Sequence, residues 1–548
     1  MKLSIKFGFA NIVIACVVTY SVPGNAQQVS TADTSAAIDQ IFQAWNKTTV
    51  PGCAIGIDLN DGHPLFRSYG SSDLEHGIAI NPSTVFEAGS VSKQFTAASI
   101  ILLVEQGRLA FSDDVRKYLP ELPNYGSVIT INQLLGHTSG LRDWGEVEAI
   151  AGWPRTSRVY SLNDTLDIAV RQQSLNYQPG AAWSYTNTGY NLLAIIVERI
   201  SKQTLAQFSH DNLFVPLDMT HTQWRDNFRR TVQDRAIAYK ADKDNYQQLM
   251  PFENTYGHGG LLTTVGDLLL WNQALTEAKL GKFVTEELTK ETMLNSGKST
   301  SYARALFINT YHNSREISHS GSTAGYRAWL GRFPDNHLSI ALLCNADDAK
   351  PVALAHKVAD VLLPADSTAK PVGMSIPVSE LKKHTGKYVD MQRGQEINLD
   401  VKDDALVTAG GGKLIPVSAS EFTTGTTKFS FIGQNRLLVQ TNNDQHEYVH
   451  MSPWPQAPEK LNALAGSYTS NEAMATYIAS VKDGQLVISP STRLGEKLVL
   501  HAIAADLFLT SIDDSAAIVR FRRNSNGSIT SMVVGSSRVY SLVFKRIP

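Results

Sequence analysis

Three short motifs in the chain carry side chains whose types and spacing could attack a carbonyl carbon. They are an S-x-x-K at Ser90–Lys93, a Y-x-N at Tyr185–Asn187 and an H-x-G at His319–Gly321. A hydroxyl can act as a nucleophile when a neighbouring amine or phenol takes up and returns its proton. Each motif is weak alone because each occurs more than once in the chain, so the surrounding elements must decide between the copies.

The S-x-x-K at Ser90 is the copy that opens a strong predicted helix, 92–106, which is apolar on nearly all sides and therefore buried. The copies at Ser367 and Ser379 fall in or beside a linker, where nothing would bury a nucleophile. Residues three apart share one face of a helix, so the amine of Lys93 can reach the hydroxyl of Ser90. Burial and the helix N-terminus both favour a neutral amine that can accept a proton. Taken alone, the motif also fits a serine that only caps the helix beside a solvated lysine.

The Y-x-N motif at Tyr185–Asn187 lies in a loop that contains Pro and Gly and precedes a predicted helix at 191–200. Tyr185 could exchange protons with the serine and the lysine, and the amide of Asn187 could orient a substrate carbonyl. The second copy, at Tyr311, comes directly before a predicted strand and is interpreted as structural.

The H-x-G motif at His319–Gly321 ends a predicted strand, where the glycine would let the backbone approach a substrate closely. The other copy begins at His258 and leads into a predicted helix near 265–274 with Thr264 as its cap. We therefore interpret the His258 copy as a turn.

The elements around the motifs predict an α+β unit. Strand-like segments stand at both ends of this unit, at 53–59, 65–69, 316–318, 326–333 and 338–344. Further helices are predicted at 31–49 and 350–362. Helices placed between two strand groups of one sheet indicate a layered α+β architecture.

The chain changes character after residue 363. Residues 364–377 are rich in Pro, Ser, Thr and Ala and are predicted to be a linker. Short alternating segments with turn residues follow, which is typical of all-β structure. A leucine, a glycine and a tyrosine recur there with the same spacing, at 381, 386 and 388 and again at 461, 466 and 468. We expect two small antiparallel barrels or sandwiches, at 378–452 and 459–548.

Composition narrows the class of protein. The chain has 548 residues with 49 basic and 51 acidic side chains, a net charge of −2, so no basic field indicates a nucleic-acid partner. With 43% hydrophobic residues it is expected to be globular. Three cysteines cannot build a disulfide framework. No segment after the N-terminal one is long and apolar enough to span a bilayer.

The N-terminal segment has the pattern of a secretory signal peptide. Two lysines precede an apolar run at 7–18, and a small-residue pattern ends at Ala26. Cleavage after Ala26 would remove residues 1–26 and leave an exported protein, periplasmic or secreted. A lipid anchor at Cys16 is the alternative, because the residues before that cysteine resemble a bacterial lipobox. The apolar run continues past Cys16, which favours cleavage after Ala26.

Together and in this order, the three motifs resemble those of the serine β-lactamase and penicillin-binding-protein superfamily. The resemblance covers about residues 35–363, and three further stretches support it: Leu134–Leu141, Phe214–Met219 and Gly259–Thr264. It implies an antiparallel sheet flanked by helices, together with an all-α lobe. Within the first of these stretches it implies a structural role for His137.

The resemblance also implies a mechanism. Ser90 would form an acyl-enzyme while Lys93 and Tyr185 relay protons. Backbone N–H groups of Ser90 and Ser322 would form an oxyanion hole. The other substrate-contacting residues would be Asn187, His319 and Gly321. No metal or other cofactor is implied, and a small peptide or ester is the expected partner.

The third motif bears on the substrate. True β-lactamases and D,D-carboxypeptidases typically carry lysine in this box, where its charge helps to bind a substrate carboxylate. His319 is expected to be mostly neutral near pH 7, which disfavours a substrate anchored in that way. The layout is similar to D-aminopeptidase-type hydrolases, in which two barrels follow the catalytic domain and a barrel loop reaches the active site. Gly410–Gly412 is either such a loop or a plain solvent loop.

These features favour an exported serine peptidase or amidase acting on short peptides, including those with D- or non-ribosomal residues. A carboxylesterase with the same serine, lysine and tyrosine is the alternative. A β-lactamase, or a non-catalytic protein that binds penicillin or muropeptides, is a weaker hypothesis. The joint presence of serine, lysine, tyrosine and asparagine argues against a non-catalytic role.

Two cysteines remain after the predicted cleavage, Cys53 and Cys344, and both are predicted on strands of the same sheet. We expect buried free thiols rather than a disulfide, because disulfides between adjacent strands are often strained.

Overall fold

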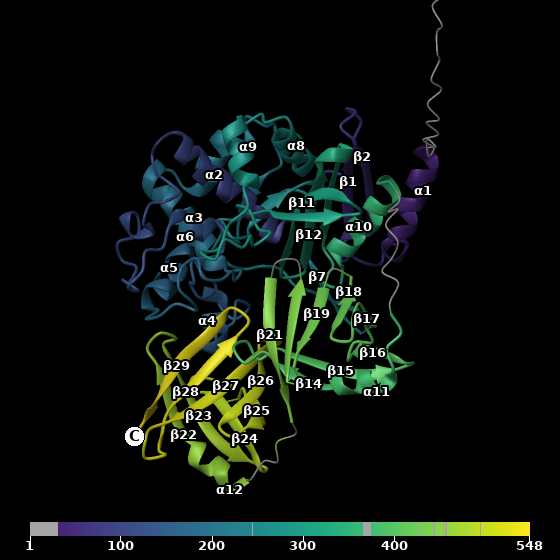
Figure 1. Ribbon diagram of the computed structural model, residues 1–548. Helices are drawn as coiled ribbons and strands as arrows, with labels where there is room; N and C mark the ends of the chain where they lie inside the picture. Colours follow the sequence, from purple (N-terminus) through teal and green to yellow (C-terminus); the bar gives the residue numbers. More distant parts are fainter. Residues whose placement is uncertain are drawn as a thin grey trace, which may run out of the picture.

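The structure is a computed structural model that describes residues 31–243, 245–364, 374–425, 427–433, 435–441, 444–452, 454, 458–493 and 495–548. The predicted signal peptide at 1–26, the alternative lipid anchor at Cys16 and residues 365–373 of the predicted linker lie outside the described residues. In Figure 1 an N-terminal unit, residues 31–363, lies above two β units, residues 378–452 and 458–548. Within the described residues, no helix combines the length and the hydropathy needed to cross a membrane.

The centre of the N-terminal unit is one six-stranded antiparallel sheet with the strand order β10-β11-β12-β13-β1-β2. Its strands are β1 (Cys53–Asp58), β2 (Leu65–Tyr69), β10 (Phe307–Tyr311), β11 (Ser314–Thr323), β12 (Tyr326–Phe333) and β13 (Leu338–Cys344). β1 pairs with β13, which joins the two predicted strand groups and confirms the α+β class. β11 is longer than predicted and contains the whole H-x-G motif. Its Ser, His and Gly residues show no apolar alternation that could reveal the strand.

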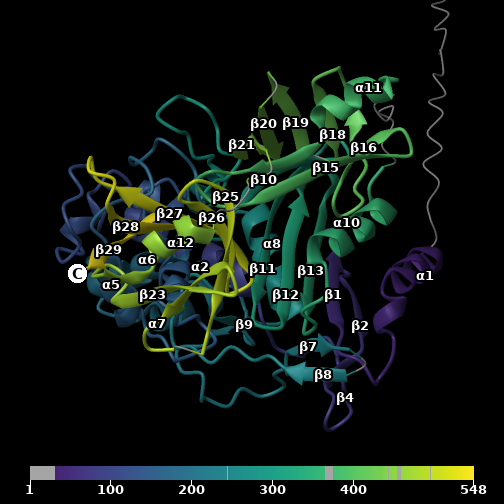
Figure 2. The same cartoon turned by 90° about the horizontal axis from the view of Figure 1, so that it is seen from below.

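Helices cover both faces of this sheet. The helices are α1 (Thr31–Ile41), α8 (Val265–Thr276) and α10 (Pro351–Leu362). Ile340 and Leu342 of β13 share a cluster with α1 and α10, whereas their neighbours Ala341 and Leu343 share one with α8. Figure 2 shows α1 and α10 on one side of the sheet and the other labelled helices of the N-terminal unit on the opposite side. Burial on both faces explains why this strand is almost continuously apolar.

A helical lobe lies beside the sheet and carries the first two motifs. Its helices are α2 (Lys93–Glu105), α3 (Ile131–Leu135), α4 (Trp144–Ile150), α5 (Leu162–Arg171), α6 (Asn187–Ser201), α7 (Leu205–Ser209) and α9 (Lys282–Thr289). α2 is buried on nearly every side, as its composition predicts, and α6, α7 and α9 pack around it. The all-α lobe implied by the resemblance is present. Short strands complete the unit: β3 (Ser71–Asp73), β4 (Ile78–Ala79), β5 (Phe86–Glu87), β6 (Gln223–Trp224), β7 (Tyr239–Asp242), β8 (Asn245–Gln248) and β9 (Leu261–Thr263).

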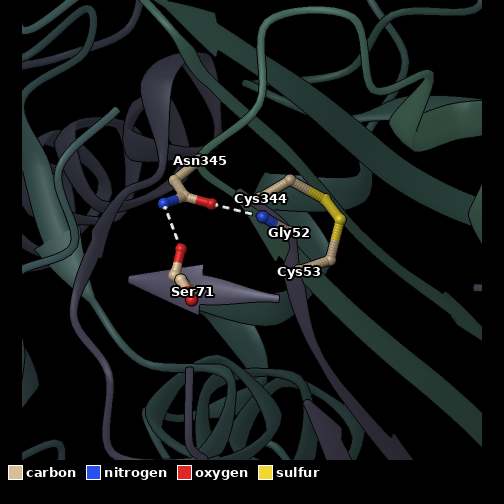
Figure 3. The surroundings of a disulfide bond; sticks show 5 residues. All are labelled: Gly52, Cys53, Ser71, Cys344 and Asn345. Atoms are coloured by element: carbon tan, nitrogen blue, oxygen red, sulfur yellow. Dashed lines mark hydrogen bonds between the residues drawn. A yellow bond between two sulfur atoms is a disulfide. The ribbon is translucent and has the colours of Figure 1, made fainter. Parts of the chain in front are cut away.

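The register of β1 and β13 places Cys53 opposite Cys344, and the two residues form a disulfide (Figure 3). Their Cα atoms are 4.0 Å apart, and both side chains are buried. The expectation of free thiols is therefore wrong. Directly opposed residues on antiparallel strands bring their Cβ atoms close together, and the sequence reveals the strands but not their register. Asn345 follows the bridge, accepting a hydrogen bond from the Gly52 N–H (2.7 Å) and donating one to the Ser71 carbonyl (3.0 Å).

Both β units are antiparallel, and the predicted repeat is visible in their structures. The first contains α11 (Val378–Leu381) and one eight-stranded sheet, β14 (Gly386–Val389), β15 (Glu396–Lys402), β16 (Ala405–Thr408), β17 (Ile415–Pro416), β18 (Glu421–Thr424), β19 (Thr427–Ile432), β20 (Arg436–Thr441) and β21 (Asp444–Met451). The second contains α12 (Pro458–Leu461) and a closed barrel, β22 (Gly466–Ser470), β23 (Ala475–Lys482), β24 (Gln485–Pro490), β25 (Leu498–Ala504), β26 (Leu507–Ile512), β27 (Ser515–Arg523), β28 (Ile529–Ser536) and β29 (Val539–Ile547). Equivalent tyrosines make equivalent hydrogen bonds, since Tyr388 donates to the His384 carbonyl (3.2 Å) and Tyr468 to the Leu464 carbonyl (2.7 Å). The prediction of two small antiparallel β-barrels is confirmed, one closed and the other nearly so.

The second β unit shares a hydrophobic core with the N-terminal unit, which the sequence does not predict. Trp144 and Ile150 of α4 lie in one cluster with Tyr477 of β23, and the Tyr477 hydroxyl donates to the Ile150 carbonyl (2.6 Å). A buried ion pair joins Arg142 to Glu472 at 2.5 Å. Figure 1 shows α4 beside the yellow strands of this barrel.

Candidate active site

The predicted nucleophile and its base are in contact at the start of α2. Ser90 lies in a 3-10 turn, Gly89–Ser92, and Lys93 is the first residue of the helix. The Lys93 Nζ is 3.2 Å from the Ser90 Oγ, 2.9 Å from the Asn187 Oδ1 and 2.6 Å from the His258 carbonyl oxygen. The i, i+3 spacing therefore produces the contact that it predicts. His258 is a turn residue, as expected, but its carbonyl also holds the lysine, and no sequence signal marks that role.

Lys93 is a buried amine that favours the neutral form. Burial lowers the pKa of Lys93 well below its usual value, and the charges of Arg538 and Arg155 act in the same direction, while Asp143 opposes them. A neutral amine has two N–H donors and one lone pair. Its donors can serve the Asn187 and His258 oxygens, so the lone pair is left facing the Ser90 hydroxyl.

Tyr185 lies over the lysine, with Lys93 Nζ 4.7 Å from the centre of its ring. The ring is half-buried, but the hydroxyl oxygen is fully enclosed and has no hydrogen-bond partner among the described residues. Burial raises the pKa of Tyr185 above its usual value. Tyr185 is thus a protonated phenol beside the nucleophile, suited to give a proton to a leaving group.

His319 of β11 is a neutral imidazole, as predicted. Burial lowers the pKa of His319 to about 3, and Lys93 acts in the same direction whenever its amine is protonated. Its Nδ1 is 2.6 Å from the Ser320 carbonyl oxygen, which can only accept, so Nδ1 carries the proton. Its Nε2 is 3.2 Å from the Tyr302 hydroxyl and accepts from it.

Tyr302 connects His319 to His137 in a buried chain that no motif indicates. The Thr186 N–H donates to His137 Nδ1 (3.3 Å), so the proton of this neutral ring is on Nε2, 3.2 Å from the Tyr302 hydroxyl. His137 therefore donates to Tyr302, and Tyr302 donates to His319. Burial lowers the pKa of His137 well below its usual value. The structural role expected for His137 agrees with this arrangement.

Two glycines allow β11 to run against the 3-10 turn that carries Ser90. A Cβ on Gly321 would lie 2.0 Å from the Ala88 carbonyl oxygen and 3.1 Å from the Ser90 nitrogen. A Cβ on Gly89 would lie 2.6 Å from the Ser322 nitrogen. The close approach brings the backbone nitrogens of Ser90 and Ser322 near one another, an arrangement compatible with the expected oxyanion hole.

These residues surround a cavity of about 730 Å³. The predicted residues that line it are Ser90, Tyr185, Asn187, His319, Gly321 and Ser322. Lys93 lies beneath them, so the structure brings all seven predicted residues together. Gly410–Gly412 belong to the described residues but do not line the cavity. Among the described residues, one group could hold a metal ion (Asp73, Glu75 and His76), and it does not line the cavity either.

Among the described residues, the second β unit reaches the site and the first does not. Its residue Arg538 lines the cavity, with the guanidinium carbon 5.1 Å from the centre of the Tyr185 ring. The other basic residues of the lining are Arg155, Arg327 and Lys350, against the single acidic residue Asp347. Arg538 lies in no motif, so sequence reasoning misses it.

Comparisons with known proteins agree with this geometry. A family model described as Beta-lactamase matches residues 38–363. Penicillin-binding protein 4* of Bacillus subtilis (strain 168) is 28% identical over 377 residues, which cover 64% of this chain and 81% of that protein. The octameric penicillin-binding protein homologue from Pyrococcus abyssi superposes with a TM-score of 0.55 at 20% identity, over 94% of this chain and 99% of that chain. The D-amino acid amidase from Ochrobactrum anthropi SV3 superposes with a TM-score of 0.53 at 19% identity, over 60% of this chain and 98% of that chain.

Proposed function

Because this chain belongs to the beta-lactamase family and is a serine hydrolase, we propose that it cleaves amide bonds of short peptides through an acyl-enzyme on Ser90. The observation that carries the proposal is the 3.2 Å contact between the Ser90 Oγ and the buried amine of Lys93. A neutral lysine in this position is a base strong enough to activate a serine hydroxyl.

The proposed reaction has two halves, acylation of Ser90 and hydrolysis of the acyl-enzyme. Ser90 Oγ attacks the carbonyl carbon and passes its proton to Lys93, while the N–H groups of Ser90 and Ser322 stabilise the negative oxygen. The carbon–nitrogen bond then breaks as Tyr185 protonates the leaving amine, and the proton on Lys93 restores the phenol. In the second half, water attacks the acyl carbon and gives a proton to Lys93. The bond between that carbon and Ser90 Oγ then breaks, and Lys93 returns the proton to Ser90 as the acid is released.

We prefer an amide substrate to an ester substrate because of Tyr185. An amine is a poor leaving group unless it is protonated, and the raised pKa of Tyr185 keeps a proton available at the site. The fold similarity to the D-amino acid amidase is in keeping with this proposal.

The purified mature protein tests the proposal on matched panels of D- and L-aminoacyl amides, linear peptides, p-nitrophenyl esters and a chromogenic cephalosporin. We expect peptide or amide turnover to exceed ester turnover. Ser90→Ala should abolish it, whereas Ser379→Ala, in an exposed copy of the same S-x-x-K pattern, should not. Activity that survives Ser90→Ala, or turnover of esters alone, would contradict the proposal.

We also propose that the protein is exported, with removal of residues 1–26. The N-terminal pattern supports this, and the disulfide between Cys53 and Cys344 fits an oxidising compartment. Intact mass of the protein recovered from cell fractions should show a chain that starts at Gln27 outside the cytoplasm. A lipid-modified Cys16, or a full-length cytoplasmic chain, would contradict it.

A further inference from the structure

The tip of one barrel hairpin reaches the active-site cavity. Strands β28 and β29 pair up to Ser536 and Val539, so Ser537 and Arg538 form a two-residue turn between them. Arg538 lines the cavity together with Ser90 and Tyr185, although it belongs to the second β unit. A barrel could close this hairpin without touching the N-terminal unit, so the contact between the turn and the cavity is not required by the barrel fold itself.

The backbone of this turn is fixed on the N-terminal unit. Glu146 of α4 accepts hydrogen bonds from the Ser536 hydroxyl (2.5 Å), the Ser537 hydroxyl (2.5 Å) and the Arg538 N–H (2.8 Å). The Asn176 amide donates to the Arg538 carbonyl at 2.9 Å. Both backbone groups of Arg538 are therefore occupied, and the position of its Cα over the cavity is set.

Two ion pairs hold the guanidinium of Arg538 in position, but its N–H donors remain available. Asp143 and Glu146 carboxylate oxygens each lie 3.8 Å from it, and the Tyr185 ring packs against it. Among the described residues its side chain makes no hydrogen bond at ordinary length, and it is 36% exposed. Its N–H fork can thus still bind a planar anion with two parallel hydrogen bonds.

Two of the three other cations of the cavity, Arg155 and Arg327, already make hydrogen bonds of ordinary length. Arg155 donates to the Glu253 carboxylate at 2.9 Å, and Arg327 donates to two backbone carbonyls, at 2.7 and 2.8 Å. Lys350 is exposed at the surface. The cavity as a whole favours an anion over a free ammonium group, and Arg538 is the cation best placed to hold one.

We propose that Arg538 binds the free carboxylate of a short peptide substrate, on the leaving-group side of the scissile bond. This side follows from the contact with Tyr185, the residue proposed to protonate the leaving amine. The inference rests on the proposed function and deepens it, because it names peptides with a terminal carboxylate as the substrate class. It also revises the expectation from His319: the cation absent from the H-x-G motif is supplied by the second β unit.

Binding to the full-length mature chain tests this without requiring turnover. In a Ser90→Ala background, calorimetry compares two peptides of one sequence that end in a free carboxylate or in a carboxamide. We expect the carboxylate peptide to bind more tightly, and Arg538→Ala to reduce that preference by about tenfold or more, since hydrogen bonds between charged groups are the strong ones. Arg538→Lys should retain part of the preference because it keeps the charge and loses the fork.

Arg520→Ala is the matched control, because Arg520 is an exposed arginine on β27 of the same barrel. It should leave the preference unchanged. Thermal unfolding of each variant shows whether the hairpin still folds. Equal binding of the two peptides by the Arg538-containing chain, or an equal loss for both peptides in Arg538→Ala, would overturn the proposal. Turnover that survives Ser90→Ala would instead overturn the proposed function, so the two failures are distinguishable.

Discussion

Lys93 is the residue on which the proposed chemistry depends most. Its amine is enclosed between Ser90, Asn187 and His258, and three charged groups act on it from different elements. Two of these groups are arginines from loops outside α2, so the state of the base is set by the tertiary structure as well as by the helix. This makes the pH dependence of the reaction sensitive to distant substitutions.

The first prediction concerns that pH dependence. With neutral Lys93 as the base, kcat/KM should rise with pH through the Lys93 pKa and stay high above it, and the rise should occur well below the ordinary lysine value of about 10.4. Asp143→Asn removes a negative charge that raises this pKa, so the rise should move to lower pH. Arg538→Gln removes a positive charge that lowers it, so the rise should move to higher pH.

Profiles of kcat/KM against pH on an uncharged ester check both shifts, with Arg538→Lys as a charge-conserving control. Shifts in the same direction for the two variants would contradict the assignment of Lys93.

The sequence predicts this part of the site well and another part not at all. Ser90 and Lys93 meet because their contact is local to one helical turn, and a motif can record it. Tyr302 and Arg538 reach the site only through the packing of distant segments. Neither stands in a recognisable pattern, so no sequence reading could place them.

At the scale of elements, the site depends on how closely β11 approaches the turn before α2. Gly321 permits that approach, since a Cβ there would lie 2.0 Å from a backbone oxygen that has no freedom to move alone. The sequence predicts only 316–318 of β11, because its polar residues give no apolar alternation, and it does not predict β10 at all. The apolar strands β12 and β13 of the same sheet match their predicted limits, while the helix predicted at 31–49 ends at Ile41.

The second prediction follows from this contact. Gly321→Ala should push β11 away from Ser90, lower kcat/KM by about 100-fold and reduce the free energy of unfolding by about 1–3 kcal/mol. Gly410→Ala is the control, because a Cβ at Gly410 meets nothing within 4 Å. Steady-state kinetics and denaturant titration measure the two effects. Wild-type kinetics in Gly321→Ala would show that the close approach is not needed.

The third prediction concerns the disulfide between the central strands β1 and β13. Cys53→Ser with Cys344→Ser should lower the free energy of unfolding by about 2–4 kcal/mol, because the bridge joins positions 291 residues apart and restricts the unfolded chain. Denaturant titration measures the loss. In the unreduced, denatured protein, Cys53 and Cys344 should not react with a thiol reagent, and reaction of both would contradict the bridge.

At the scale of the whole molecule, the second β unit and the N-terminal unit are parts of one folded body. Their shared cluster around Trp144 and the buried pair of Arg142 and Glu472 join them. The sequence predicts two β units from periodicity and repetition. It does not predict which surface each one covers, because interface residues have the same apolar composition as the core.

The fourth prediction tests the interface between the second β unit and the N-terminal unit. Glu472→Gln would leave the Arg142 guanidinium buried without its partner, and should reduce the free energy of unfolding by about 3–5 kcal/mol. Glu447→Gln breaks an exposed pair with Arg436 in the first β unit and should cost about 0–1 kcal/mol. Thermal unfolding followed by tryptophan fluorescence compares the two variants. Equal losses would mean that the buried pair does not hold the units together.

The two-residue turn at Ser537 and Arg538 also has a consequence for how the substrate specificity of such an enzyme can evolve. Its backbone is anchored by Glu146 and Asn176 and not by its own side chain at 538. Exchange of that one side chain would therefore alter which molecules are accepted while leaving the nucleophile and its proton relay in position, and loss of the positive charge would also raise the pKa of Lys93. Selection for new substrates can therefore act on residue 538 of the barrel without substitution of the catalytic residues.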